Sequence, residues 1–429
     1  MAISPFHLGW FVDLRPPSVN RAWSGSSNYD WPNVFFVDMA RALDRAKFDF
    51  MLFPDAPRID ETYGAGFGAA LSVGQFMLDP MAIAPILAHQ TRGIGIFPTT
   101  SVTDWNPYTL ARLLASMDAV TNGRIGWNMI TGGNESTAAN MGFDPIPHDT
   151  RYELANEFVD AVTQLWDSWE PGAVVFEHPT GMRTDGSKVH AINFKGKYFR
   201  TRGPLTMPRS PQGRPVLAQA GASGVGRDFA SRFADVVLGS QGSVEGMKAY
   251  REDILARATK FGRDASQLRV LFLIQPHLGD WQAEAEERFL LRTTGPQSVT
   301  ANLVVRSAHW NVDLSTLDLD KPLPADLKTE GHQAELDLAR ASGKTLRELA
   351  SSGYADGLMH LIGTPETVAG QMEEIMQEVG GDGFLIVHQW VDRRVIVEVT
   401  DGLVPVLQRR GLVRREYDSP YFRGNLFAF

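Results

Sequence analysis

Short runs of apolar residues alternate with amphipathic stretches along most of the chain. Each run is continuous, which is typical of strands in a parallel sheet that is covered on both faces. The stretches between the runs repeat apolar residues at a spacing near 3.6, which predicts helices. Eight strands are predicted in this way, over residues 6–12, 48–53, 93–97, 124–130, 215–219, 234–238, 268–275 and 383–387.

The order of these elements favours an α/β fold of one type. Helices are expected over 33–47, 80–90, 107–119, 221–233, 245–260, 283–291 and 391–411, with two more starting near 148–152 and at 364. No G-x-G-x-x-G motif follows any strand, so a (β/α)8 TIM barrel is favoured over a doubly wound sheet. The alternation breaks near 171–205, which reads as a hairpin, and near 293–354, which is polar and weakly periodic. We therefore predict a single barrel domain over 1–429 with insertions at these two places, the second folding over the barrel.

Composition narrows the classes of function. The 429 residues include no cysteine, which excludes disulfides, thiolate metal sites and cysteine nucleophiles. With 41 basic and 50 acidic residues the formal charge is −9, which argues against a nucleic-acid surface. Neither a signal-peptide pattern nor an apolar run long enough to cross a membrane occurs, so a cytoplasmic protein is expected.

Polar residues gather at the predicted carboxyl ends of the strands, where barrels of this type carry their sites. The set contains few charges, which suits a neutral, heteroatom-rich ring bound by hydrogen bonds. A plainer interpretation is that each residue only caps a strand or satisfies a loop. The residues are Asp55, Thr99, Ser101, Asn128, Thr131, Gln219 and His388.

A helix start and a glycine-rich loop predict a phosphate-binding site. His148 and Tyr152 are four residues apart at the start of the long helix, which Asp149 or Thr150 is expected to cap. The loop 219–227 carries Ser223 and Gly224 before the next helix and lacks the Gly-Lys-Ser/Thr of a Walker loop. Together these segments offer hydroxyl, imidazole and backbone N–H donors to an anion, although a tight turn alone would also explain the loop.

Aromatic residues near strand ends are candidates for the wall of a substrate pocket. Trp10 and Phe11 end the first strand, Phe53 ends the second, and Trp390 follows the last. Ordinary core packing is the alternative for each of them. His309, in the second insertion, would serve in substrate contact or proton transfer if that segment covers the barrel.

Hydrolase and metal chemistry find little support in the sequence. Glu135 follows the fourth strand, where a glycosidase could carry its acid, but the seventh strand has no carboxylate until Asp280. The ten histidines are scattered without the close spacing of a metal site, so no metal is expected.

Motifs along nearly the whole chain resemble the bacterial-luciferase-like flavin monooxygenases. Within them the chain is similar to the branch of nitrilotriacetate, dibenzothiophene-sulfone and pristinamycin monooxygenases. Gly132 and Gly133 replace the serines that are more usual after the fourth strand, and Trp310 replaces a small residue. The segments that carry the resemblance are 53–55, 123–131, 148–169, 208–215, 219–223, 363–366 and 404–408.

The resemblance implies an FMN site at the mouth of the barrel and a substrate site beside it. FMN would contact Asp55, Thr99, Ser101 and Asn128, with its phosphate near His148, Tyr152, Ser223 and Gly224. His309 would be the catalytic residue near the substrate, and the pocket would include Trp10, Phe11, Phe53, His388 and Trp390.

The implied activity is that of a two-component monooxygenase. A separate NAD(P)H:flavin reductase would supply reduced FMN, which reacts with O₂ to a C4a-hydroperoxide. One oxygen atom would then pass to a small molecule at a C–S, C–N or activated aromatic centre. A homodimer or homotetramer is expected. Two alternatives stay open, a deazaflavin-dependent oxidoreductase on the same fold and a flavin-binding protein without catalysis.

Overall fold

Eight parallel strands form a closed barrel in the computed structural model, which describes residues 5–16, 31–329, 333–351, 358–388 and 391–429. Neighbouring strands pair in the order β1, β2, β3, β4, β9, β10, β11 and β13, and β13 pairs again with β1. The (β/α)8 fold and its eight predicted strands are confirmed. Their bounds are β1 His7–Phe11, β2 Phe50–Phe53, β3 Gly95–Ser101, β4 Gly126–Ile130, β9 Val216–Gln219, β10 Val236–Gly239, β11 Arg269–Leu278 and β13 Gly383–Val387.

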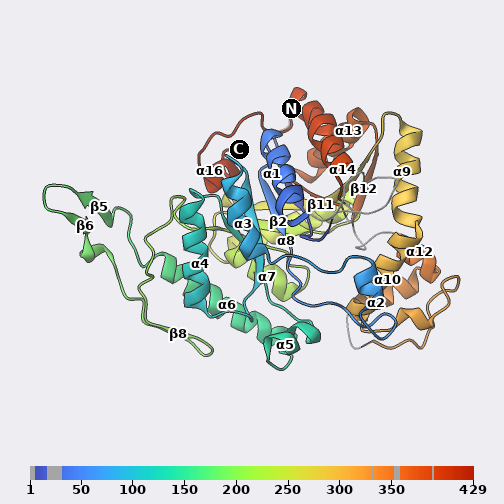
Figure 1. The fold of residues 1–429 in the computed structure, drawn as a ribbon, viewed down its shortest axis with the longest axis horizontal. Helices are drawn as coiled ribbons and strands as arrows, with labels where there is room; N and C mark the ends of the chain where they lie inside the picture. Colours follow the sequence, from blue (N-terminus) through green and yellow to red (C-terminus); the bar gives the residue numbers. More distant parts are fainter. Residues whose placement is uncertain (1–4, 17–30, 330–332, 352–357, 389–390) are drawn as a thin grey trace.

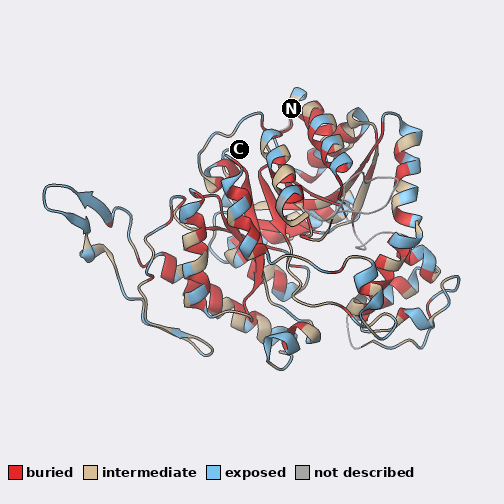
Figure 2. Cartoon of the chain, viewed as in Figure 1, coloured by how far each residue is buried: buried red, intermediate tan, exposed pale blue. Residues whose placement is uncertain are grey.

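Helices surround the barrel and turn their buried faces to it (Figures 1 and 2). The last predicted helix is broken into α14 and α15 by a π-helical segment, Glu398–Leu403. In the part of the chain that the structure describes, we find no helix with both the length and the apolar composition that a membrane crossing requires. The surrounding helices are α1 Phe36–Arg45, α3 Pro80–His89, α4 Pro107–Val120, α6 His148–Trp166, α7 Gly224–Phe233, α8 Val244–Lys260, α13 Pro365–Val379, α14 Arg393–Val397 and α15 Val404–Arg409.

The barrel interior is filled partly by the end of the chain. Helix α16, Phe422–Leu426, places Phe422 and Leu426 among the apolar side chains inside the barrel, with Phe50 and Phe97. A Cβ added to Gly95 would lie 2.4 Å from the Phe422 ring, so a residue with a side chain at that position of β3 would displace α16. We call the segment 412–429, which includes α16, the plug. The C-terminal segment thereby closes the amino-terminal end of the barrel.

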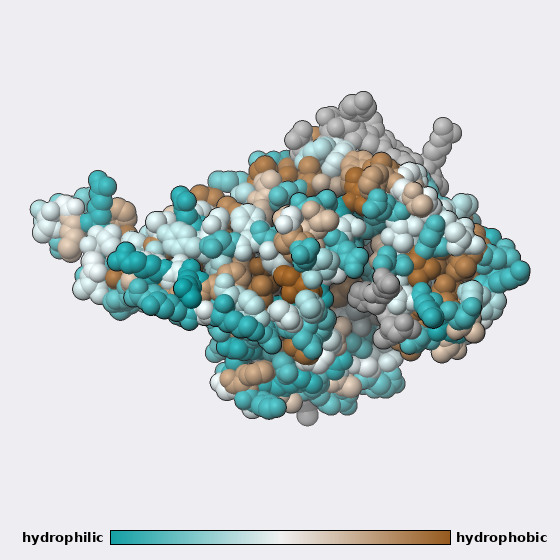
Figure 3. All heavy atoms as spheres, turned by 90° about the horizontal axis from the view of Figure 1, so that it is seen from below, coloured by the Kyte–Doolittle hydropathy of each residue, from teal (hydrophilic) through white to brown (hydrophobic). Residues whose placement is uncertain are grey.

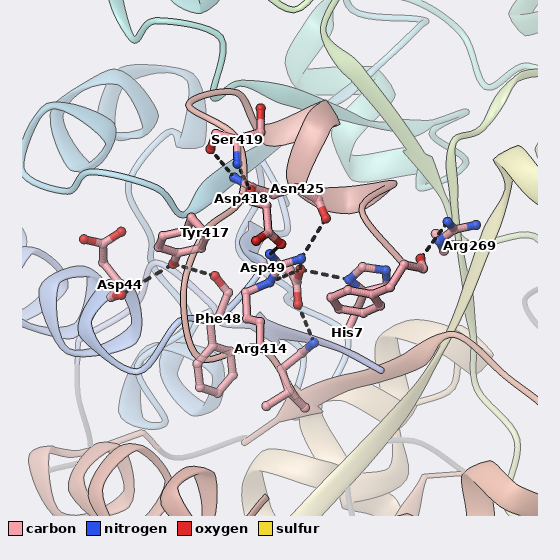
Figure 4. A network of polar contacts seen from close by, with 12 residues as sticks. His7, Asp44, Phe48, Asp49, Arg269, Arg414, Tyr417, Asp418, Ser419 and Asn425 are labelled. Atoms are coloured by element: carbon pink, nitrogen blue, oxygen red, sulfur yellow. Dashed lines mark hydrogen bonds and ion pairs between the residues drawn. The ribbon is translucent and has the colours of Figure 1, made fainter. Parts of the chain in front are cut away.

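Buried charges fasten this plug to the first two strands (Figure 4). Asp49, just before β2, lies 2.8 Å from His7 Nδ1 and accepts a 3.0 Å hydrogen bond from Arg414 Nε. Arg414 also donates a 2.7 Å bond to the Asn425 carbonyl oxygen. Burial alone would raise the pKa of Asp49, but the charges of His7 and Arg414 outweigh it and hold the pKa below its ordinary value.

The second insertion is mostly helical and has an apolar core of its own. Trp310, Leu314 and Leu349 lie in that core. One strand was not predicted: β12, Met359–Gly363, pairs in parallel with the end of β11, which extends past the barrel. Figure 1 shows the insertion beside the barrel, where α2, Gly68–Ser72, contacts α10. Its helices are α9 Gln282–Thr294, α10 Pro296–Trp310, α11 Gln333–Ala341 and α12 Leu346–Ser351.

The first insertion forms two antiparallel hairpins, β5 Val174–Glu177 with β6 Met182–Thr184 and β7 Phe194–Lys195 with β8 Arg200–Thr201. The β5–β6 hairpin stands clear of the rest of the molecule in two views a quarter turn apart (Figures 1 and 3). All four residues of β5 are exposed, and Phe176 is 66% exposed.

Candidate functional site

The carboxyl ends of β3 and β4 place two predicted polar residues side by side. Thr99 and Asn128 are partners in the strand register, and Asn128 Nδ2 donates a 2.8 Å hydrogen bond to Thr99 Oγ1. Both side chains are buried, and Asn128 Oδ1 has no hydrogen-bond partner among the described residues. Leaving a buried carbonyl oxygen without a donor costs about 1–3 kcal/mol, which a ligand with a suitable N–H group would recover.

Ser101 and Asp55 lie on the same side of the barrel mouth in different surroundings. Ser101 ends β3, and its Oγ lies 2.6 Å from Thr103 Oγ1. Asp55 follows β2 and lines an open groove beside the mouth. Burial, together with the nearby carboxylates of Asp79 and Asp104, raises the pKa of Asp55 to about 6. Asp55 therefore changes its protonation state just below neutral pH.

The starts of α6 and α7 meet, and this joins the His148–Tyr152 pair to the loop after β9. The ring centroids of His148 and Tyr152 are 5.1 Å apart. A Cβ built on Gly226 would lie 2.8 Å from the Tyr152 hydroxyl and 3.1 Å from Ser223 Oγ, so both hydroxyls approach one point that a glycine leaves open. A Cβ on Gly224 would meet no atom within 4 Å, so the first turn of α7 is uncovered.

The first turn of α7 is well suited to bind an anion. Ser223 is the N-cap, and its Oγ accepts a 3.1 Å hydrogen bond from the Gly226 N–H. Its hydroxyl hydrogen therefore remains available to a ligand, beside the backbone N–H groups that point along the helix dipole. Behind the loop, the Tyr250 hydroxyl donates a 2.6 Å bond to the Gly221 carbonyl oxygen. Tyr250 thus holds the loop in place, and no motif in the sequence indicated this contact.

The expected cap of α6 by Asp149 or Thr150 is wrong. Helix α6 begins at His148 after Pro147, and no side chain caps its first N–H groups. The Asp149 carboxylate lies 2.8 Å from His148 Nδ1 instead. The helix therefore begins two residues earlier than a cap at Asp149 would place it, and three residues earlier than a cap at Thr150.

An apolar cavity opens on the other side of the mouth, at the carboxyl ends of β1 and β13. Phe11 and His388, both expected at a substrate pocket, line it. Trp10 and Phe53, expected there too, are fully buried in the core between the barrel and its helices and do not line this cavity. Adjacent strand residues point to opposite faces, so Phe11 and Trp10 cannot both face the mouth. Trp390 lies outside the described residues.

His309 lies in the last turn of α10, four residues after Val305, which lines the apolar cavity. Residues four apart share one face of a helix, so His309 is on the cavity side of α10, one turn beyond the wall. Its side chain is half-buried and does not itself line the cavity.

Two further histidines, His277 and His360, lie behind His388. His277 Nε2 is 3.1 Å from His360 Nδ1, and the ring centroids of His277 and His388 are 6.1 Å apart. Burial, with the neighbouring histidines and Arg292, lowers the pKa of His277 and of His388 well below the ordinary value, so both rings are neutral at neutral pH. The signal was present in the sequence, because His277 and His388 end neighbouring strands. In the described part of the chain, no three His, Asp or Glu side chains are placed to hold a metal ion.

Residues 17–383 match the family described as luciferase-like monooxygenase. The chain belongs to this family. The resemblance seen in the motifs and the expectation of an enzyme of this class are thereby confirmed.

Curated relatives of this luciferase-like monooxygenase extend over almost its whole length. Dibenzothiophene-sulfone monooxygenase of Rhodococcus erythropolis (strain XP) is 33% identical over 438 residues, covering 98% of this chain and 96% of the relative. Nitrilotriacetate monooxygenase component A of Aminobacter aminovorans is 34% identical, covering 91% of this chain and 89% of the relative. A crystal structure of riboflavin lyase with modified FMN and substrate riboflavin superposes with a TM-score of 0.86 at 26% identity, covering 99% of this chain and 96% of that one.

In this luciferase-like monooxygenase the predicted site residues separate into two parts of the mouth. The polar side consists of the ends of β2, β3 and β4 and the starts of α6 and α7. The apolar cavity lies between β1, β13 and α10. Adjacent barrel strands connect the two parts, because β1 pairs with both β2 and β13.

Proposed function

We propose that the chain is an FMN-dependent monooxygenase that inserts one atom of O₂ into a small organic molecule at a C–S, C–N or activated aromatic centre. One observation supports this above the others. Asn128 Oδ1 is buried without a donor among the described residues, and the strand next to it, β9, leads to an uncovered helix start that suits a phosphate. The proposal is that one flavin nucleotide fills both places.

The residues present fit FMN in their chemistry. An isoalloxazine ring has N–H and carbonyl groups along one edge, which suits Asn128, Thr99 and the titratable Asp55. The phosphate is a dianion near neutral pH and suits the donors offered by Tyr152 and Ser223 with the first N–H groups of α7. The described residues of these two parts include no lysine and no group of side chains placed to hold a metal ion, both of which a nucleoside triphosphate site would need. Ser101, His148 and Gly224 complete the proposed binding set.

Reduced FMN, when bound, supplies the two electrons that activate O₂. The protein's residues have simpler tasks. Thr99 and Asn128 orient the ring, the α7 start holds the phosphate, and the apolar cavity keeps water away from the reacting centre. His309, on the cavity side of α10, is proposed to exchange a proton with the substrate.

A separate NAD(P)H:flavin reductase is the proposed source of reduced FMN. No dinucleotide fingerprint follows any strand of the barrel. The printed name of the Aminobacter relative, component A, supports a system of more than one protein. Because that reductase draws on NAD(P)H, we propose that the reaction takes place in the cytoplasm.

Oxygen uptake with isotope labelling tests the function. The purified chain, a flavin reductase, NADH and FMN are mixed with sulfur, nitrogen and haloaromatic compounds under ¹⁸O₂. We expect one ¹⁸O atom in the product and none without FMN. Labelled product in the absence of flavin would contradict the proposal, as would turnover under nitrogen with a reduced deazaflavin. Direct reduction of FMN by NADH with this chain alone would contradict the separate reductase.

A homodimer or homotetramer is also proposed, and the β5–β6 hairpin supports it. An isolated two-stranded hairpin is marginally stable in water, yet this one exposes Val174, Phe176 and Met182. Packing against a second copy would bury them. We expect Phe176→Ser to shift the mass measured by light scattering toward the monomer, while the control Phe261→Ser, at an exposed residue of the body, leaves it unchanged. Equal masses for Phe176→Ser and the parent would remove the hairpin from the interface.

A further inference from the structure

The apolar cavity has room for an organic molecule much larger than O₂. Its volume, counted as the space that the centre of a water-sized sphere can occupy, is about 60 Å³. Barrel strands form one wall and helix α10 of the second insertion forms the other. A ligand there meets mostly hydrocarbon, so its binding depends on the apolar area that it buries. The residues that make these walls are Phe11, Phe35, Ala301, Val304, Val305 and Val387.

The charged groups that line the cavity form an ion pair inside the protein, in which Arg15 Nε makes no hydrogen bond among the described residues. Arg15 Nε lies 3.7 Å from Asp13 Oδ2, so this pair adds no net charge to the wall. The Gln75 amide accepts a 2.9 Å bond from the Asp60 N–H and donates back to its carboxylate. Among the described lining residues, therefore, no uncompensated cation is present to attract a carboxylate or phosphate.

His388 differs from the rest of the wall. Its side chain is 5% exposed, and Nε2 has no hydrogen-bond partner among the described residues. Trp10 packs at 5.8 Å and His277 at 6.1 Å between ring centroids, so apolar and neutral rings hold it in place. A buried imidazole nitrogen without a partner at the wall of a cavity is a group that a ligand can satisfy.

The groove on the polar side of the mouth also disfavours anions. Asp55, Asp79, Asp104 and Glu135 line it, and the pKa of Asp55 is raised by burial and by two of these neighbours. Its described cation, Arg58, is held by Asp60 at 2.8 Å. A polycarboxylate would meet negative charge in this groove and no free counter-charge in the apolar cavity.

Resting on the proposed monooxygenase function, we infer that the substrate is an uncharged, largely apolar molecule with one hydrogen-bonding heteroatom, and that His388 Nε2 binds this atom. The cavity selects by buried apolar area, and His388 sets the orientation of the heteroatom. Tricarboxylates, the class to which nitrilotriacetate belongs, are excluded by the same two features.

Binding to the FMN-loaded chain tests this class. The probes are uncharged sulfones of increasing size, from dimethyl sulfone to dibenzothiophene sulfone, each compared with the analogue in which CH₂ replaces SO₂. Size-matched carboxylates and nitrilotriacetate complete the set, and the dissociation constants come from calorimetry. We expect at least one sulfone to bind, roughly fivefold more tightly than its CH₂ analogue because of one hydrogen bond, and the carboxylates to bind more weakly than both.

Three variants separate the hydrogen bond from the cavity. His388→Leu should abolish the preference for sulfone over the CH₂ analogue, and His388→Gln, which keeps an amide N–H, should restore part of it. Val304→Trp should fill the cavity and weaken both ligands equally. FMN affinity is measured in each variant, and we expect it to stay unchanged, which shows that the barrel is folded.

The outcomes distinguish the two proposals. The inference would be overturned if a carboxylate bound most tightly, if no uncharged probe bound, or if His388→Leu kept the preference for sulfones. In each of these cases, binding of FMN by the parent chain would still support the proposed function. Failure of the parent chain to bind FMN would overturn the proposed function itself.

Discussion

At the amino-terminal end of the barrel, Asp49 is fully buried and its oxygens are met by His7, Arg414 and the Leu8 N–H. At the carboxyl end, Asn128 Oδ1 and His388 Nε2 are buried just as deeply, and neither has a partner among the described residues. One end carries a buried carboxylate whose charge is compensated, although His7 Nε2 and Arg414 Nη1 make no hydrogen bond among the described residues. The other end carries neutral groups that also lack a partner. Removing one partner of a buried ion pair would strongly destabilise the fold. A neutral buried group without a hydrogen bond lowers stability only modestly, and a ligand that bonds to it recovers this free energy. The absence of a buried net charge at the carboxyl end supports the site that we propose there.

The largest expected effect is on stability, and it follows from disrupting the buried Asp49 network at the amino-terminal end of the barrel. Arg414→Gln leaves the Asp49 carboxylate buried with less positive charge, which should lower the free energy of unfolding by about 3–5 kcal/mol. The exposed control Arg409→Gln, whose partner Glu366 lies 3.5 Å away, should change it by less than about 0.5 kcal/mol. Urea unfolding of the flavin-free protein measures both. Similar losses in the two variants would mean that the buried network does not fasten the plug.

A smaller effect of another kind is expected at the polar side of the mouth. Tyr152→Phe removes a hydroxyl that we propose meets the FMN phosphate, and should weaken FMN binding by about 1.5–3 kcal/mol without changing the free energy of unfolding. His148→Ala should weaken FMN binding in the same direction. Tyr108→Phe is the control, because its hydroxyl makes only a 3.4 Å contact to the Pro204 carbonyl oxygen. Fluorescence titration with FMN gives the affinities, and equal values for Tyr152→Phe and the control would remove Tyr152 from the site.

The smallest effect concerns Asp55, whose pKa is about 6 in the folded protein and 3.8 without the fold. Between these pH values the folded state keeps a proton that the unfolded state has released. The protonated Asp55 therefore contributes its full stabilisation below about pH 4. This stabilisation is lost as the pH rises toward 6, and above pH 6 Asp55 causes no further change in stability. Asp55→Asn should remove this loss, so its melting temperature should rise relative to the parent between pH 4 and 6. A constant difference across this range would show that Asp55 ionises normally.

The strands of the barrel could be predicted because burial on both faces leaves a local mark, a continuous apolar run. The strand-end residues Thr99 and Asn128 followed from that register. β12 left no such mark, because Met359–Gly363 pairs only with an extension of β11 beyond the barrel and is partly exposed. The plug was missed for a related reason: Phe422 and Leu426 lie in a short helix whose partners are hundreds of residues away.

The pocket wall was harder to predict than the polar side. Burying a polar side chain is unfavourable unless it forms hydrogen bonds, so a polar residue such as Asn128 at the end of an apolar strand indicates a binding site. An aromatic residue at a strand end can pack either toward the helices or toward the barrel mouth. Only the strand register determines which of Trp10 and Phe11 lies at the pocket. The contact between His277 and His360 was missed because it depends on the pairing of β11 with the unpredicted strand β12, and the second insertion separates these two strands in sequence.

The plug has a consequence for how the molecule is made. Because Phe422 and Leu426 pack with Phe50 and Phe97 inside the barrel, the inner apolar surface of the first strands stays uncovered until residues 422–426 dock. The first strands are made about 370 residues before this helix, so their inner surface is covered late in folding whichever elements form first. Phe429, whose ring stacks on His7 at 4.5 Å, joins the first strand in the same late step.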